Sequence, residues 1–265
     1  MSILKKIVKF KKNEVKQAKL KMPIEEIMKE IMKAPANRNF KDVFENNPFS
    51  IIAEIKKKSP SKGVLRASIV AGKLAKLYEE AGARAISVVT DKKFFDGKMA
   101  YIQEVKKDCY LPVLRKDFII DEYQLYESRA ARADAVLLIA SILDKKTLNK
   151  FVKKCRFMNM TPVVETHSAE DIKKAVSSGA DIIGINTRDL KNFKTDFKVI
   201  KNLLKNVPKD KIVIIESGIL KVSDIEKIKI DSRIKGVLIG SMFMKAKETQ
   251  IKSDIREIMN KYGND

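Results

Sequence analysis

Residues 50–63 read SIIAEIKKKSPSKG, a stretch that changes character halfway along its length. Its apolar first half is typical of a buried strand, yet it leads directly to the carboxylate of Glu54 and then to three consecutive lysines. A buried carboxylate is unfavourable unless it is paired, so we expect Glu54 to form an ion pair or to take part in chemistry. Pro60 and Gly63 interrupt regular structure, which predicts a mobile, cationic loop over residues 56–63.

Short apolar runs alternate with helical patterns along the rest of the chain. This alternation is typical of βα units that build a parallel sheet. We expect eight strands, at residues 51–55, 85–90, 112–114, 135–140, 162–165, 182–186, 212–216 and 237–240. Eight units in a chain of 265 residues favour a closed (β/α)8 barrel, or TIM barrel, over an open doubly wound sheet. Neither a GxGxxG motif nor a P-loop motif indicates a nucleotide-binding fold.

Residues 1–48 are predicted to form a helical extension that packs on the barrel of residues 49–265, the two making one structural domain. Residues 1–22 carry eight lysines and one acidic residue, with apolar residues on one helical face. A second helix is expected at residues 24–33. A basic amphipathic helix can also lie on an anionic membrane, but Phe10 is its only large aromatic anchor, which favours docking on the rest of the protein.

The composition favours anionic partners, because 55 basic and 34 acidic residues give a formal charge of +21. Phosphate esters, nucleic acids and acidic membrane surfaces all fit that charge. No block of basic residues with interleaved aromatics is present, which argues against nucleic acid. Cys109 and Cys155 form no metal motif, and neither a signal peptide nor a run of the roughly 18 apolar residues of a membrane span is found. We therefore expect a cytoplasmic protein that does not bind membranes.

Charged and polar side chains follow five of the expected strands. A barrel collects the carboxyl ends of its strands at one rim, where such folds hold their catalytic groups. The candidates are Glu54, Lys56, Lys116, Glu165, Asn186, Arg188, Glu216 and Ser217. A structural ion pair would explain any one of them equally well, but five such strand ends together favour an active site. Carboxylates and ammonium groups at one rim of the barrel suit proton transfer, because burial raises a carboxyl pKa and a nearby cation lowers it.

Glycines at two adjacent strand ends indicate a phosphate site. Gly218 follows the seventh expected strand, and Gly240 with Ser241 follows the eighth, just before a short helical stretch at residues 242–246. Barrels bind phosphate at this place through loop amides and the N-terminus of a short helix.

His167 is the only histidine of the chain and stands two residues after Glu165. A lone histidine in such a position is more often a surface or helix-start residue than a catalytic one. With one histidine and no cysteine cluster, we expect no metal site.

The motifs along the barrel resemble those of one enzyme family. In order and spacing they read IIAEIKKKSPSKG, PVLRKDF, PVVETHS, GINTRDL, IESGI and VLIGS. This set is similar to indole-3-glycerol phosphate synthase of tryptophan biosynthesis over residues 50–245, and the N-terminal helices resemble that family's extension less specifically. As a set the motifs are highly specific, whereas GINTRDL alone would fit several phosphate-binding barrels.

The resemblance implies cofactor-free conversion of 1-(2-carboxyphenylamino)-1-deoxyribulose 5-phosphate to indole-3-glycerol phosphate, with loss of carbon dioxide and water. Carried to matching positions, it makes Lys116 the general acid of ring closure and Glu165 the acid or base of the dehydration. Lys56 would contact the anionic substrate and share or exchange the acid role with Lys116, a division that the sequence leaves open. Glu54 and Glu216 would orient these groups and stabilise a cationic intermediate.

The remaining positions are implied as substrate contacts. They are Asn186 and Ser217 within the catalytic set, Lys58, Ser59 and Arg188 at the anionic groups, and Gly218, Gly240 and Ser241 as the phosphate cradle. Arg188 is also implied as a rim partner of Glu216. The substrate would be a small molecule with a phosphate and a carboxylate, no cofactor or metal is implied, and we expect a monomer or a weak homo-oligomer.

Two other interpretations stay open at this point. The first is phosphoribosylanthranilate isomerase, another small phosphate-binding barrel, whose design resembles a cysteine and aspartate acid/base pair. Cys109 precedes the third expected strand and Cys155 falls in a helix, so neither stands at the carboxyl end of a strand. The second is a basic protein that binds nucleic acid or a membrane surface through its charge of +21.

Overall fold

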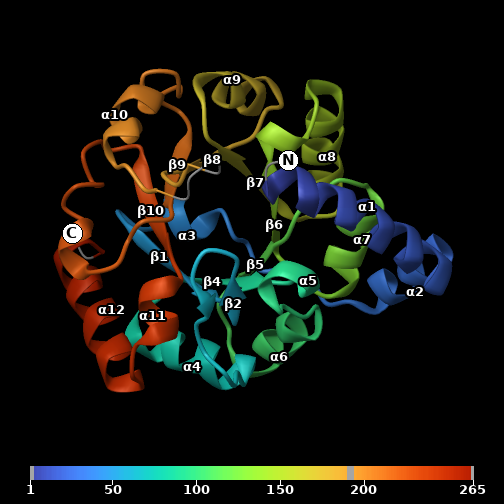
Figure 1. The fold of residues 1–265 in the computed structure, drawn as a ribbon, viewed down its shortest axis with the longest axis horizontal. Helices are drawn as coiled ribbons and strands as arrows, with labels where there is room; N and C mark the ends of the chain where they lie inside the picture. Colours follow the sequence, from blue (N-terminus) through green and yellow to red (C-terminus); the bar gives the residue numbers. More distant parts are fainter. Residues whose placement is uncertain (1–2, 190–193, 264–265) are drawn as a thin grey trace.

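The computed structural model describes residues 3–189 and 194–263 and contains a closed barrel of eight parallel strands (Figure 1). Around the barrel the strands follow the order β1, β10, β9, β8, β7, β6, β5, β4. Their bounds are β1 (Ser50–Ile55), β4 (Ala85–Val89), β5 (Val113–Lys116), β6 (Ala135–Ile139), β7 (Thr161–Thr166), β8 (Ile182–Asn186), β9 (Ile212–Glu216) and β10 (Ile234–Ile239). The predicted (β/α)8 barrel is therefore confirmed. Two strand boundaries differ most, because β5 continues to Lys116 and β10 already begins at Ile234.

Helices surround the barrel on its outside (Figure 1). They are α4 (Ala71–Ala81), α6 (Ala100–Asp108), α7 (Tyr123–Ala130), α8 (Lys145–Phe157), α9 (Ala169–Ser177), α10 (Lys198–Leu204) and α12 (Glu248–Tyr262). Shorter pieces are α5 (Lys92–Phe95), α11 (Ser241–Lys245) and the 3₁₀ turns η1 (Ala140–Ile142) and η2 (Val222–Asp224). Between β9 and β10, where every residue is described, η2 takes the place of an α-helix.

Strand periodicity fills the barrel interior with apolar side chains. Successive residues of a strand point to opposite faces, so every second residue faces inward. The inward apolar residues include Ile52, Ala85, Leu114, Ala135, Val163, Ile182, Ile214 and Leu238. Phe40 and Phe44, from the segment around α3 (Asp42–Glu45), pack against the same cluster and close it below the strands. The interior is thus a packed core that leaves only the carboxyl-terminal rim open.

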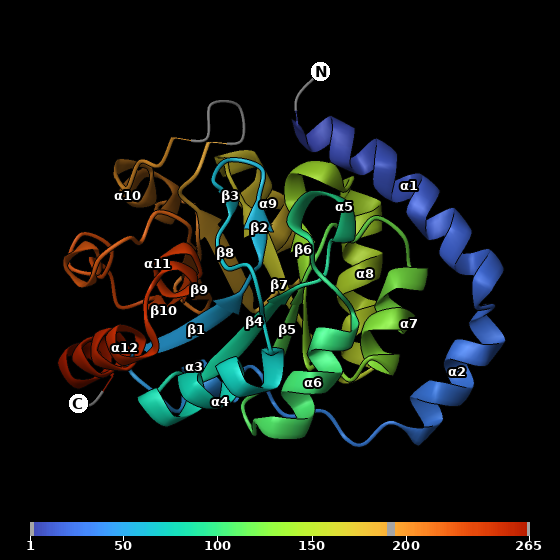
Figure 2. The ribbon, with the colours of Figure 1, turned by 60° about the horizontal axis from the view of Figure 1, so that its bottom comes forward.

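The segment after β1, expected as a cationic loop over residues 56–63, contains short regular structure on both sides of its turn, and its mobility stays a prediction. It makes a two-stranded antiparallel hairpin of β2 (Lys58–Ser59) and β3 (Gly63–Val64). Pro60 lies in the turn of this hairpin. Gly63, the first residue of β3, takes the left-handed backbone conformation at φ +66°. An ion pair of 2.6 Å between Lys57 Nζ and Asp96 Oδ2 holds the hairpin to the chain after α5. Figure 2 shows the hairpin standing above the barrel strands.

The N-terminal helices α1 (Ile3–Lys21) and α2 (Ile24–Lys33) curve around the outside of the barrel (Figure 2). Val15 of α1 and Ile27 of α2 pack with Tyr123 of α7 in a small apolar cluster. The Tyr123 hydroxyl donates to the backbone oxygens of Ala18 and Met22, at the junction of the two helices. The helices thus dock on the barrel, while a boundary after residue 48 stays a prediction. None of the described helices is long and apolar enough to cross a membrane.

Lys11 anchors α1 to the barrel through a buried ion cluster. Its side chain is 2% exposed, and Nζ lies 3.0 Å from Asp91 Oδ2 and 2.9 Å from Asp117 Oδ1. Burial alone would lower the pKa of Lys11, but Asp117, Asp91 and Glu14 outweigh it and raise the pKa. The Asp117 carboxylate also pairs with Arg115. Because Asp91 follows β4 and Asp117 follows β5, one ammonium group connects the extension to two strand ends.

We expect Lys11→Met to lower the free energy of unfolding by about 3 kcal/mol, because it removes the buried cation from Asp91 and leaves Asp117 with Arg115 alone. Methionine keeps the unbranched apolar chain, so the change reports mainly on charge. Urea unfolding followed by circular dichroism measures the loss. Lys12→Met is the matched control, since Lys12 is exposed on the same helix. Equal stability of the two variants would contradict the anchoring role.

Candidate active site

Strand alternation explains how the charged residues reach the rim. Glu54, Lys116, Glu165 and Glu216 each stand two residues beyond an inward apolar residue of the same strand, namely Ile52, Leu114, Val163 and Ile214. Since every second side chain faces the same way, these four charged groups point into the barrel mouth.

The rim residues line one pocket together with the hairpin and the start of α1. Of the expected site residues it is lined by Glu54, Lys56, Ser59, Lys116, Glu165, Asn186, Arg188, Glu216, Ser217, Gly218, Gly240 and Ser241. The remaining one, Lys58, is exposed on β2 and does not line the pocket. In a strand, Lys58 and Ser59 must point to opposite sides, and the structure turns Ser59 inward.

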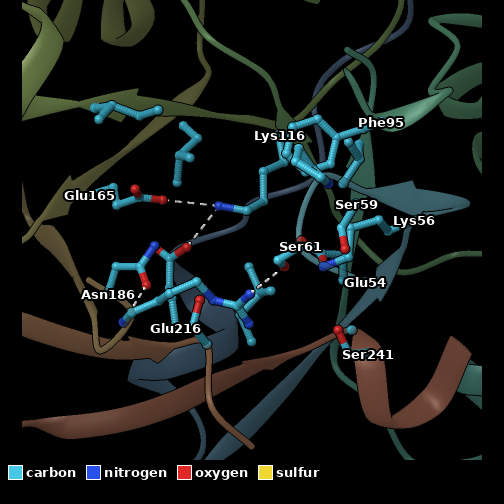
Figure 3. A pocket seen from close by; sticks show the side chains of 18 of the residues that line it. Glu54, Lys56, Ser59, Ser61, Phe95, Lys116, Glu165, Asn186, Glu216 and Ser241 are labelled. Atoms are coloured by element: carbon cyan, nitrogen blue, oxygen red, sulfur yellow. Dashed lines mark hydrogen bonds and ion pairs between the residues drawn. The ribbon is translucent and has the colours of Figure 1, made fainter. Parts of the chain in front are cut away.

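Lys116 lies between two carboxylates at the centre of the pocket (Figure 3). Its Nζ is 3.0 Å from Glu165 Oε2 and 2.9 Å from Glu216 Oε2. Burial alone would lower the pKa of Lys116, but the charges of Glu165, Glu216 and Glu54 outweigh it and raise the pKa. Lys116 is therefore held as an ammonium group that can give a proton to a bound molecule.

The two carboxylates around Lys116 differ in their affinity for a proton. For Glu216, burial raises the pKa and the charge of Glu165 adds to the rise, against the attraction of Lys116. For Glu165, burial acts in the same direction, but Lys116, His167 and Asn186 outweigh it and lower the pKa. Two buried carboxylates that share one cation cannot both be fully ionised without cost. The arrangement separates an ionised carboxylate from one that takes up a proton readily.

Glu54 pairs with Lys56, two residues along the same chain segment. The Glu54 side chain is buried, whereas Lys56 keeps partial contact with solvent. Gly240 makes room for this pair, because a Cβ at that position would overlap Glu54 Oε1. The charge expected at the end of the first strand is thus paired, and its partner is the first lysine after the strand.

Arg188 and Asn186 extend the polar wall along the strand end of β8. Asn186 Oδ1 accepts a hydrogen bond of 3.0 Å from the backbone N–H of Arg188. The Arg188 guanidinium donates to Ser61 Oγ on the hairpin at 3.0 Å (Figure 3). Glu216, the partner that the resemblance implies for Arg188, pairs with Lys116 instead. Arg188 therefore connects the rim to the hairpin.

The expected phosphate cradle lies where β9 and β10 end. Ser217 and Gly218 both adopt left-handed backbone conformations, with φ of 72° and 85°. Thr187 Oγ1 donates to the backbone oxygen of Ser217 and fixes this turn. Gly240 directly precedes α11, which begins at Ser241 where a short helix was expected. Backbone N–H groups at the start of a short helix are suited to an anion.

The sequence did not reveal the apolar half of the pocket. Ile3, Leu4 and Ile7 of α1 form part of it, together with residues from around the barrel, Phe95, Phe118, Leu137, Ile139 and Leu238. Strand periodicity could have identified Leu137 and Leu238, but the α1 residues come from far away in the sequence.

Gly184 is a further site residue that sequence reasoning missed. It lies in the middle of β8, and a Cβ there would overlap Glu216 Oε1. A glycine inside a strand often marks the close approach of another group, which is the signal that was available.

His167 lies beside Glu165, with its Nε2 3.4 Å from Glu165 Oε1. The sequence favoured a surface or helix-start position for this histidine, and α9 begins two residues later, at Ala169. Among the described residues, no group of three or more histidine, cysteine or acidic side chains could hold a metal ion.

Comparisons with protein families and with known sequences point to the same enzyme family. A family model described as indole-3-glycerol phosphate synthase matches residues 4–258. The indole-3-glycerol phosphate synthase of Caldanaerobacter subterraneus subsp. tengcongensis is 46% identical over 256 residues, covering 97% of this chain and 98% of the relative. That of Alkaliphilus metalliredigens is 43% identical over 257 residues and covers 97% of each chain.

Solved structures agree on the barrel. Thiamine phosphate pyrophosphorylase from Pyrococcus furiosus matches with a TM-score of 0.59 at 15% identity, over 82% of this chain and 98% of that chain. Monomers of the dimeric phosphoribosylanthranilate isomerase from Thermotoga maritima match with a TM-score of 0.57 at 12% identity, over 80% of this chain and 99% of that chain. At such identities the likeness shows the fold alone.

We expect Gly184→Ala to lower both the melting temperature and kcat, because the added methyl group displaces the Glu216 carboxylate from Lys116. Overpacking in a filled core typically costs about 1–3 kcal/mol. Thermal unfolding and turnover assays measure the two effects.

The double variant Gly184→Ala with Glu216→Ala tests the cause. If the methyl group acts by colliding with Glu216, it destabilises the Glu216→Ala protein much less than the wild type. An equal loss of stability in both backgrounds would mean that Gly184 acts elsewhere.

Proposed function

The chain belongs to the indole-3-glycerol phosphate synthase family, and from this premise we propose that Lys116, Glu165 and their neighbours carry out the chemistry of that family. The family is a carboxy-lyase of tryptophan biosynthesis, which acts on a small phosphorylated substrate. The match over residues 4–258 does not favour the isomerase or the basic binding protein as alternatives. The observation that carries the assignment of roles is the position of Lys116 Nζ between Glu165 and Glu216.

The pocket suits a substrate with an aromatic ring at one end and a phosphate at the other. The aromatic ring would lie against the apolar side, near Phe95, Phe118 and Ile139. The phosphate would bind at Gly218, Gly240 and Ser241, where glycine lets the backbone approach an anion. The linear substrate would then cross the centre of the pocket, where Lys116 lies.

Ring closure joins an aromatic carbon to the ketone carbon of the substrate. Negative charge develops on the ketone oxygen, and Lys116 donates a proton to it. The ring carries positive charge until carbon dioxide leaves and its bonding electrons restore the aromatic system. Glu54 and the ionised form of Glu216 stabilise this positive charge, because both carboxylates are buried at the pocket wall.

Dehydration completes the indole. The new hydroxyl group leaves as water after it gains a proton, and a base removes a proton from the adjacent carbon. Glu165 is suited to be that base, because its lowered pKa keeps it ionised. Lys56, directly after β1, is a second cation that lines the pocket and is the proposed donor to the leaving hydroxyl. Asn186 and Ser217 bind the substrate hydroxyls. Arg188 and Ser59 line the side of the pocket that faces the hairpin.

We further propose that the protein is a cytoplasmic monomer or weak homo-oligomer. Cys109 and Cys155 are both free and buried, which fits a reducing compartment.

We expect Lys116→Met and Glu165→Gln each to lower kcat by about 100-fold or more, the range for loss of a general acid or base. Conversion of the carboxyphenylamino-deoxyribulose phosphate, followed by indole fluorescence, measures the rate. Turnover by the wild type should persist in EDTA, since side-chain ammonium and carboxylate groups supply the charge stabilisation.

Lys173→Met is the control for the first variant, because Lys173 is an exposed lysine on α9. Its activity should equal that of the wild type. Full activity in both Lys116→Met and Glu165→Gln would contradict the proposed roles of these two residues.

A further inference from the structure

His167 is a partly buried imidazole with two buried ring nitrogens, and the proposed roles do not use it. Its side chain is 15% exposed, and neither ring nitrogen has a hydrogen-bond partner within the described structure. A buried polar group without a partner is unfavourable, so such a group calls for an explanation. The polar atom that faces it is Glu165 Oε1, at 3.4 Å from Nε2.

The start of α9 holds the backbone of His167 in place. Ser168 is the N-cap, and its Oγ accepts a hydrogen bond of 3.1 Å from the N–H of Asp171. Asp171 Oδ2 in turn accepts a hydrogen bond of 3.1 Å from the backbone N–H of His167. This reciprocal capping ties the residue to a helix terminus. The ring therefore faces Glu165 from a fixed backbone.

The two oxygens of Glu165 have different partners. Oε2 accepts a hydrogen bond from Lys116, whereas Oε1 lies 3.4 Å from His167 Nε2. A contact of 3.4 Å becomes a hydrogen bond after a shift of a few tenths of an ångström, and catalytic hydrogen bonds commonly shorten when substrate binds. His167 is thus placed to hold the second oxygen.

We propose that His167 is a positioning residue, which donates from Nε2 to Glu165 Oε1 and keeps that carboxylate oriented and ionised after Lys116 has given up its proton. The inference rests on the proposed role of Glu165. When Lys116 donates to the substrate it becomes neutral, and Glu165 loses its nearest cation. The imidazole then provides a donor to Oε1, in addition to the Asn186 side chain, while dehydration still requires a base.

Other charged groups surround this pair and are part of its electrostatic balance. Lys116 and Glu216 face Glu165 from β5 and β9, and Asp171 and Lys174 lie on α9 behind His167. Of these, only Lys116 changes its charge in the proposed ring closure. His167 is therefore the neighbour whose donor compensates for that change.

Kinetics of His167→Phe and His167→Gln test the proposal. Phenylalanine keeps the ring volume without a donor, and we expect kcat to fall roughly 10- to 100-fold, the effect of one hydrogen bond to a charged group, with KM nearly unchanged. The acid limb of the pH profile should move to higher pH, because loss of His167 removes one of the influences that lower the pKa of Glu165. Glutamine places an amide N–H near the position of Nε2, so it should restore most of the rate.

The single histidine permits a readout that does not depend on activity. The imidazole nitrogen resonances of the wild type belong to one residue, and they should shift in Glu165→Gln. Glu170→Gln is the matched control, because Glu170 is an exposed acid in the first turn of α9 and should leave those resonances in place. If Glu165→Gln proves active while the resonances shift, the contact stands and the proposed role of Glu165 fails.

Three results would overturn the inference. The first is a His167→Phe enzyme with unchanged kcat and pH profile. The second is a rise in KM at constant kcat, which would make His167 a substrate contact. The third is an equal loss in His167→Phe and His167→Gln, with both proteins folded as judged by circular dichroism, since a donor at this position would then be irrelevant.

Discussion

The ammonium group of Lys116, held between Glu165 and Glu216, is the interaction on which the site depends. One cation lies within 3.0 Å of carboxylates from two other strands, so β5, β7 and β9 must meet at one point. Only a closed sheet with the observed register brings these strand ends together. The same pairing gives the two carboxylates opposite pKa shifts, which separates their chemical roles.

A second buried cluster, around Lys11, makes the N-terminal extension part of the site. The lysine connects α1 to Asp91 and Asp117, and Asp117 directly follows Lys116 in the chain. The anchored helix then contributes Ile3, Leu4 and Ile7 to the apolar side of the pocket. The extension thus adds to the apolar surface that Phe95, Phe118 and Ile139 of the barrel present to an aromatic substrate.

Two close approaches at glycine show how tightly the mouth of the barrel is packed. Gly184 leaves space for the Glu216 carboxylate, and Gly240 leaves space for the Glu54 carboxylate. In each case a methyl group would overlap a carboxylate oxygen. The positions of these carboxylates therefore depend on the two glycines, which leave the space, as well as on the ion pairs.

The sequence alone determined the strands and the rim residues, because both follow from local patterns. Alternation of apolar runs and helices predicts the barrel, and a polar residue two positions after an inward residue predicts the rim. Only the tertiary structure decided the pairings: Lys116 with Glu165 and Glu216, Arg188 with Ser61, and Lys11 with two strand ends. These contacts join residues distant along the chain, and the hairpin at residues 58–64 likewise depends on cross-strand bonds that composition does not reveal. Local sequence patterns determine the type and order of the barrel elements, whereas their partners depend on how the elements close in space.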